Sequence, residues 1–236
     1  MKSKTLILVS ILILSFALLG APPPEDEVVI AAGTTYNGDI STTSSEITIL
    51  EGARVKGTVQ STNGDIYVEA GARVKKIISV NGDVFLNQSV TVDQTIDMTN
   101  GSLNVDDNST LNGDVTNENG DIRISGSYLK KSIKTRHGDI VLKNNTYVKK
   151  NIEILDRGQS STLEPLDIYL GAGVFIDGNV SAEDDDDKVV LELFGGEVDG
   201  NVNDIEIVGD EDDEDDEDDE DDEDDDEDDD DEDDDG

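Results

Sequence analysis

One pattern is repeated in ITILEGARVKGTVQSTNGD (residues 47–65), IYVEAGARVKKIISVNGD (66–83) and VFLNQSVTVDQTIDMTNGS (84–102). Each segment opens with two apolar residues that flank a third residue, and each ends in Asn-Gly followed by Asp or Ser. A self-similar unit of about 20 residues is typical of a solenoid, in which each repeat stacks on its neighbours. The repeat therefore decides the fold class.

The pattern continues in both directions and gives nine coils of nearly equal length, apart from two that carry insertions. The coils start at Val28, Ile47, Ile66, Val84, Leu103, Ile122, Ile140, Ile168 and Leu191. Apolar residues recur two, seven or eight, and eleven or twelve positions after each start. The last of these columns consists of Ile40, Val59, Ile78, Ile96, Val115, Ile133, Ile152, Val180 and Val202. Only 34% of the chain is hydrophobic, so unbroken columns do not arise by chance.

The spacing predicts an all-β fold. Inward positions near 0/+2, +6/+8 and +12/+14 of each coil indicate three short strands, each alternating between inside and outside with a period of two. We expect a single-stranded parallel β-helix over residues 28–209, with about nine coils stacked at ~4.8 Å to a length of about 45 Å. Two insertions, at 155–165 and 181–188, are expected at corners, where they leave the core undisturbed.

The corners carry Asn-Gly-Asp or a close relative. Glycine supplies a positive φ, and Asn and Asp bond to the local backbone, so we interpret these triplets as turn residues. The alternative is a ladder of metal-ligating carboxylates, formed by Asp65, Asp83, Asp121 and Asp139. His137 replaces asparagine at one such corner and is expected to be a solvent-exposed turn residue.

Catalytic chemistry is poorly supported. The chain has no cysteine, which excludes thiolate sites, and a single histidine, so zinc sites and Ser-His-Asp triads are poorly supported. We expect no enzyme and no cofactor. The alternative is a polysaccharide lyase or hydrolase, because larger β-helices include such enzymes.

Residues 1–21 are predicted to be a signal peptide. Lys2 and Lys4 precede an apolar stretch, and Ser15 and Ala17 provide small residues at −3 and −1 for a signal peptidase. Residues 22–27 form a proline-containing linker. We therefore expect export to the periplasm, the cell surface or the extracellular space, without a membrane span after cleavage. The competing interpretation is an uncleaved anchor, for which the apolar stretch is shorter than the ~20 residues that span a bilayer.

Residues 210–236 form a polyacidic tail. Every residue from Asp210 to Asp235 is acidic, and outside that run 32 acidic side chains face 17 basic ones. Such a block repels itself and is expected to be disordered. Nucleic-acid binding is not expected, because phosphate contacts need a positive surface. Between its ends at Asp210 and Asp235, the tail is expected to bind Ca²⁺ weakly and diffusely.

A ridge of basic residues follows one corner of the predicted helix. It consists of Lys56, Lys75, Lys76, Lys130, Lys131, Lys149 and Lys150. We interpret it as a solvated face that balances the acidic corners. The alternative is a docking strip for a polyanion, such as the tail.

The coils resemble those of the bactofilins, the bacterial polymer-forming cytoskeletal family. The resemblance lies in short stacked segments such as Val55-Lys56-Gly57-Thr58-Val59 and Ile176-Asp177-Gly178-Asn179-Val180 and covers about residues 28–207. It implies a right-handed β-helix that polymerises end to end without nucleotide. Unlike that family, this chain has a signal segment and an acidic tail.

Together with the predicted signal segment and the lack of a catalytic constellation, the repeat leads us to expect a non-enzymatic exported scaffold whose partners are other copies of itself and cell-envelope polymers. The self-association residues would be those of the end strands, Val28 and Ile30 at one end and Ile205 and Ile207 at the start of a tenth coil. The alternatives are a surface protein that binds Ca²⁺ weakly and a polysaccharide-active protein.

Overall fold

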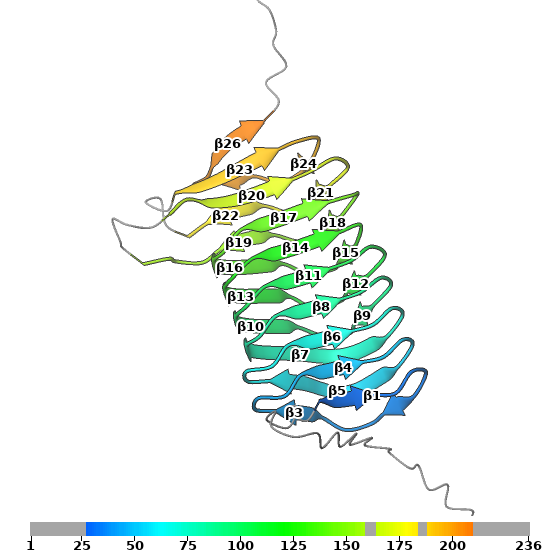
Figure 1. Ribbon diagram of the computed structural model, residues 1–236. Helices are drawn as coiled ribbons and strands as arrows, with labels where there is room; N and C mark the ends of the chain where they lie inside the picture. Colours follow the sequence, from blue (N-terminus) through cyan, green and yellow to red (C-terminus); the bar gives the residue numbers. More distant parts are fainter. Residues whose placement is uncertain (1–26, 159–163, 184–187, 210–236) are drawn as a thin grey trace, which may run out of the picture.

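A computed structural model describes residues 27–158, 164–183 and 188–209. In these ranges the chain winds into a parallel β-solenoid of about nine turns, and it contains no helix (Figure 1). The predicted all-β fold is confirmed. The predicted signal peptide, most of the linker and the acidic tail lie outside the described residues.

Three strands per coil form three faces. The first face is a ten-stranded sheet of β1 (Val28–Ile30), β4 (Ile47–Ile49), β6 (Ile66–Val68), β8 (Val84–Leu86), β11 (Leu103–Val105), β14 (Ile122–Ser125), β17 (Ile140–Lys143), β20 (Leu166–Leu170), β23 (Val189–Leu193) and β26 (Glu206–Gly209).

The second face contains β2 (Thr35–Tyr36), β9 (Thr91–Val92), β12 (Thr110–Leu111), β15 (Tyr128–Leu129), β18 (Tyr147–Val148), β21 (Phe175–Ile176) and β24 (Glu197–Val198). The third contains β3 (Ile40–Thr42), β10 (Ile96–Asn100), β13 (Val115–Asn119), β16 (Ile133–His137), β19 (Ile152–Ile154), β22 (Val180–Ala182) and β25 (Val202–Asn203). In two coils one strand bends across both faces: β5 (Arg54–Ser61) and β7 (Arg73–Asn81).

Every pair of neighbouring strands is parallel, and equivalent residues stack. Val28, for example, pairs with Ile47, and Ile47 pairs with Ile66. One predicted core position is wrong. Val59 pairs with Ile77 rather than Ile78, so Ile77 is fully buried and Ile78 faces outward. The coil of residues 66–83 is one residue shorter than the coils on either side of it. The residue is missing at the corner before the third strand, where the pairing of β5 with β7 shifts by one position.

The core is a continuous aliphatic column. The side chains that fill it include Ile47, Ile66, Leu103, Ile122 and Ile140, all with no exposed surface. A single coil cannot bury this face, so burial of ~1.5–3 kcal/mol per large side chain depends on the coils above and below. The coils at the two ends are less buried because each has a neighbour on one side only among the described residues.

One interior column is polar for part of its length. At 13 or 14 positions after the coil start, the solenoid buries Ser61, Ser79, Asn117 and Thr135. Three of these side chains hold the following glycine corner: Ser61 Oγ accepts from the Gly64 N–H at 2.9 Å, Ser79 Oγ donates to the Gly82 carbonyl at 2.8 Å, and Asn117 Nδ2 donates to the Gly120 carbonyl at 2.7 Å. These three polar groups fix the backbone at the corner that leads to the next coil, whereas the Thr135 hydroxyl has no partner among the described residues.

The tenth coil begins in a different register from the predicted one. Leu191, a coil start, pairs with Ile207, so Ile207 and not Ile205 continues that column. The two insertions follow β19 and β22 and lie at corners, as predicted; the structure adds that this is the same corner of adjacent coils.

Candidate functional site

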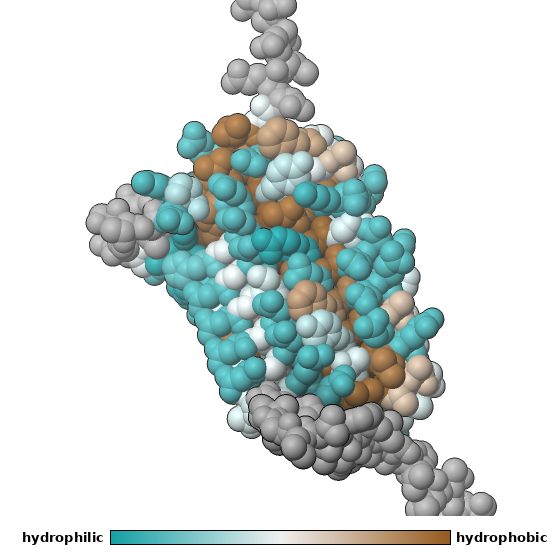
Figure 2. All heavy atoms as spheres, viewed as in Figure 1, coloured by the Kyte–Doolittle hydropathy of each residue, from teal (hydrophilic) through white to brown (hydrophobic). Residues whose placement is uncertain are grey.

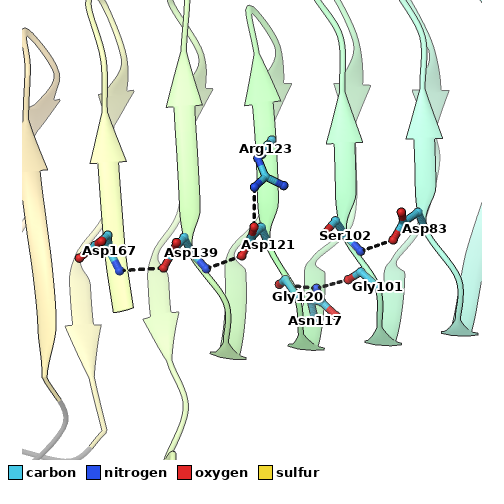
Figure 3. Close-up of polar contacts among 9 residues, drawn as sticks. All are labelled: Asp83, Gly101, Ser102, Asn117, Gly120, Asp121, Arg123, Asp139 and Asp167. Atoms are coloured by element: carbon cyan, nitrogen blue, oxygen red, sulfur yellow. Dashed lines mark hydrogen bonds and ion pairs between the residues drawn. The ribbon is translucent and has the colours of Figure 1, made fainter. Parts of the chain in front are cut away.

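The Asp residues at the corner before the first face form hydrogen-bonded ladders between coils. Asp121 Oδ1 accepts from the Asp139 backbone N–H at 3.0 Å, and Asp139 Oδ1 accepts from the Asp167 N–H at 3.0 Å (Figure 3). Asp65 and Asp83 do the same for the coils that follow them, at 2.9 and 2.7 Å. Each carboxylate therefore satisfies a backbone donor of the next coil.

This geometry supports turn chemistry at the corner. One oxygen of Asp65, Asp83, Asp121 and Asp139 bonds to the backbone, and the second oxygen of Asp121 accepts from Arg123 at 2.5 Å. In the part of the chain that the structure describes, no group of three or more acidic or histidine side chains could hold a metal ion. His137 is half-buried at the end of β16, rather than fully exposed, because it stacks on Asn119.

Asparagine side chains form a second ladder just before the glycine. The Nδ2 of Asn81 donates to Asn63 Oδ1 at 2.9 Å, Asn100 donates to Asn81 at 2.8 Å, and Asn119 donates to Asn100 at 3.0 Å. The repeat in sequence thus becomes a chain of amides that runs along the solenoid axis.

The lysine ridge is divided into two groups. Lys56 and Lys75 lie on adjacent coils, and Lys76 is paired with Asp97 at 2.7 Å. The second group, here called the lysine corner, consists of Lys130, Lys131, Lys149 and Lys150. All four are exposed, and none forms an ion pair within the described ranges. The lysine corner joins the second face to the third on two adjacent coils.

A separate hydrogen-bond ladder continues beside the lysine corner. The Ser132 N–H donates to Asp114 Oδ1 at 3.1 Å, the Asn151 N–H to Ser132 Oγ at 3.3 Å, and the Asn179 N–H to Asn151 Oδ1 at 3.1 Å. The backbone of this corner is therefore held by the residue after each lysine pair. The lysine ammonium groups take no part in it.

Outward aromatic residues stack in columns that sequence reasoning missed. Tyr128, Tyr147 and Phe175 form a continuous stack with ring centroids 5.3 and 5.7 Å apart, and Tyr67 stacks on Phe85 at 4.9 Å. The available signal was that Tyr128 and Tyr147 occupy the same position of successive repeats. The rings cover one another's faces, which makes the stack a stabilising contact between coils.

The shortest ion pair between coils of the third face joins β16 to β19. Lys134 Nζ lies 2.5 Å from Glu153 Oε2. This contact raises the pKa of Lys134, mainly through its hydrogen bond to Glu153. Burial pushes the pKa of Glu153 upward, but its hydrogen bonds with Lys134 and Asn151 outweigh that effect and leave the pKa lowered. Both shifts favour the charged pair.

The two ends of the solenoid leave strands paired on one side only. Within the described ranges β1 pairs with β4 alone, and β26 pairs with β23 alone. Of the four predicted self-association residues, Ile30 lies in the core with 8% exposure, Val28 and Ile205 are half-buried, and Ile207 is 54% exposed. Val208 and Phe194 are also exposed at the C-terminal end, where Figure 2 shows hydrophobic residues gathered.

The comparisons with known proteins give one family. Toastrack DUF4097 matches residues 58–214, more than half of the chain and most of the solenoid. Searches of curated proteins and of solved structures gave no match. Among the described residues, no helix is long and apolar enough to cross a membrane. On the extent of this match, the chain belongs to the Toastrack DUF4097 family.

Proposed function

We propose that this protein is a non-enzymatic exported scaffold that self-associates through the ends of its solenoid, in the manner that its resemblance to the bactofilins implies. The observation that carries the proposal is strand β1, which within the described residues pairs with another strand on one side only. A strand with one unpaired edge offers backbone donors and acceptors to another chain. The absence of a catalytic constellation in the sequence is compatible with a structural role.

The backbone of β1 directs one residue toward the open end. The Val28 N–H donates to the Glu46 carbonyl of the next coil at 2.9 Å, and the Ile30 carbonyl accepts from the Leu50 N–H at 3.0 Å. Because backbone groups alternate in direction along a strand, the N–H and C=O of Val29 point away from the solenoid. Val29 is 44% exposed, and among the described residues no strand pairs with this edge.

The C-terminal end differs in charge. By the same alternation, the backbone groups of Ile207 point away from β23, but the chain continues from Gly209 into the unbroken acidic run. Two C-terminal ends brought together would repel each other at low salt, whereas two N-terminal ends would not. We therefore propose an N-to-N dimer in low salt, which extends into filaments when divalent cations neutralise the tail.

Proline at position 29 tests the contact directly. Val29→Pro removes the one N–H of β1 that faces the open end and leaves the hydrogen bonds of Val28 and Ile30 to the next coil intact. We expect the variant to be monomeric in analytical ultracentrifugation at low salt, and to form no filaments in electron micrographs recorded with calcium.

Val29→Thr is the matched control. Threonine is β-branched like valine and keeps the N–H, so this variant should dimerise and extend as the unmodified protein does. Thermal unfolding of both variants checks that the solenoid remains folded. If the unsubstituted protein is folded but monomeric at every salt and calcium concentration, end-to-end assembly is refuted.

A further inference from the structure

We infer that the lysine corner is a binding site for the acidic tail of the same chain. The site consists of Lys130, Lys131, Lys149 and Lys150, and the occupant is part of the segment 210–235. This inference is independent of end-to-end assembly, because the lysine corner lies on the side of the solenoid.

The corner does not need lysine for its turn. The strand register aligns Lys130-Lys131-Ser132 with Asn112-Gly113-Asp114 in the coil before. It aligns Lys149-Lys150-Asn151 with Asp177-Gly178-Asn179 in the coil after. An Asn-Gly or Asp-Gly pair therefore makes the same turn on both sides. Lysine replaces the small turn residues on two adjacent coils without contributing to the hydrogen-bond ladder.

The lysine corner is a cluster of positive charge in a chain that is acidic overall. The chain has 58 acidic and 17 basic residues, yet four lysines gather here on stacked coils. Nearby carboxylates are partly engaged: Asp177, above Lys149, accepts from the Tyr147 hydroxyl at 3.1 Å, and Asp114 accepts from the Ser132 N–H. None of the four lysines forms an ion pair among the described residues, so like charges at coil spacing repel one another and a polyanion relieves this repulsion.

The tail is long enough to reach the corner. The described chain ends at β26, and the coils of β18 and β15 lie three and four coils below it. At ~4.8 Å per coil this is about 14–19 Å along the axis. The acidic run spans up to about 85 Å when extended, so it can pass Asp199 and Asp177 and still reach the lysines. Attachment to the same chain gives an effective concentration of about millimolar.

Other ligands fit the corner less well. A neutral sugar would need exposed aromatic faces, but Tyr128, Tyr147 and Phe175 stack on one another and present edges. An external polyanion must compete with the tail at its high local concentration. The chemistry of the corner therefore favours the carboxylates that the chain itself supplies.

Paramagnetic labelling of the full chain tests the inference. The chain has no cysteine, so Asp222→Cys places a single nitroxide in the middle of the tail. We expect the amide resonances around residues 130–131 and 149–150 to broaden in low salt. Broadening should disappear in about 1 M salt, where the Debye length falls to ~3 Å. It should also disappear when Lys130→Gln and Lys149→Gln are combined.

The matched control combines Lys56→Gln with Lys75→Gln. These lysines directly follow the second-face strand position on two other adjacent coils, as Lys130 and Lys149 do, so the change in charge is equal. Broadening that is kept in this control supports a specific site, and equal loss in both variants refutes it. A mixture of isotope-labelled protein without nitroxide and nitroxide-labelled protein without isotope should show no broadening. Broadening in that mixture would show that the tail binds a second copy, which would refute the intramolecular site. The absence of broadening in every sample would also refute it.

Discussion

At the scale of single residues, the solenoid separates inward from outward positions sharply. Neighbouring residues on one strand differ in burial: Val92 has no exposed surface, whereas Thr91 beside it is half-buried and faces outward. The same substitution should therefore be strongly destabilising at an inward position and nearly without effect at an outward one.

Val92→Asp places a carboxylate between stacked coils without a partner. Burial of an unpaired charge should cost several kcal/mol, or a fall in Tm of about 10 °C or more. Gln60→Asp is the control, because Gln60 faces outward and stacks between the uncharged residues Ser41 and Ile78. It should shift the Tm by no more than about 1–2 °C. Similar Tm values for the two variants in a thermal melt would contradict the assigned register.

The corner carboxylates provide a second test. Asp139→Ala removes the acceptor of the Asp167 N–H, a hydrogen bond to a charged group worth about 1.5–3 kcal/mol. Asp139→Asn keeps an oxygen in the same place and should lose much less. Hydrogen exchange at the Asp167 amide should accelerate in the alanine variant alone. Equal exchange in both variants would show that this ladder does not hold the corner.

At the scale of elements, the glycines at the corners serve two different purposes. Gly71 has a φ of +66° and open space around it, so its role is conformational. Gly82 lies outside the left-handed region, but a Cβ there would meet the Gly64 carbonyl oxygen at 2.4 Å. The first glycine permits a turn, and the second permits two coils to stack.

Alanine substitution separates the two purposes. Gly71→Ala should cost about 1–2 kcal/mol, the strain of a left-handed residue. Gly82→Ala must push two coils apart and should cost more, with faster hydrogen exchange at the corners of both coils. Chemical denaturation measures both costs. A smaller cost for Gly82→Ala than for Gly71→Ala would mean that the stack relaxes easily.

Much of this element-scale arrangement could be predicted from the sequence, because one face of each strand is buried in the coils between the two ends of the solenoid. The core columns followed from the spacing alone. Ile77 and Ile78 were confused because both are aliphatic, and the spacing does not show which corner lost a residue. Outward features, such as the stack of Tyr128 on Tyr147, escaped prediction because the outer surface accepts almost any side chain. The ridge of lysines could be recognised in the sequence. Its alignment with the Asn-Gly-Asp corner of the neighbouring coil could be established only from the strand register.

At the scale of the whole molecule, charge is distributed unevenly between the solenoid and the acidic tail. The acidic run from Asp210 to Asp235 accounts for nearly half of the 58 acidic residues in the chain. The carboxylates at the corners bond to the backbone, as Asp121 and Asp139 do, whereas we expect those of the tail, which lie outside the described residues, to bind Ca²⁺ weakly.

Deletion of residues 210–235 should therefore remove most calcium binding. We expect several ions to bind the full chain with a Kd of about a millimolar, as weak oxygen sites do, and few to bind the deleted chain. Calorimetry measures the stoichiometry, and an unchanged thermal melt shows that the solenoid is intact. Stoichiometry that survives the deletion would move the calcium sites to the Asp corners of the solenoid.

The hydrogen bonds between coils run along the long axis, and the first and last strands lie at opposite ends of the rod (Figure 1). A pulling force applied between these ends loads the bonds one coil after another, because each coil contacts only its neighbours. Every coil that peels away releases roughly 65 Å of chain. Anchored at both ends, such a rod would lengthen in steps at low tension and would yield under strain as an extensible tether rather than a stiff strut.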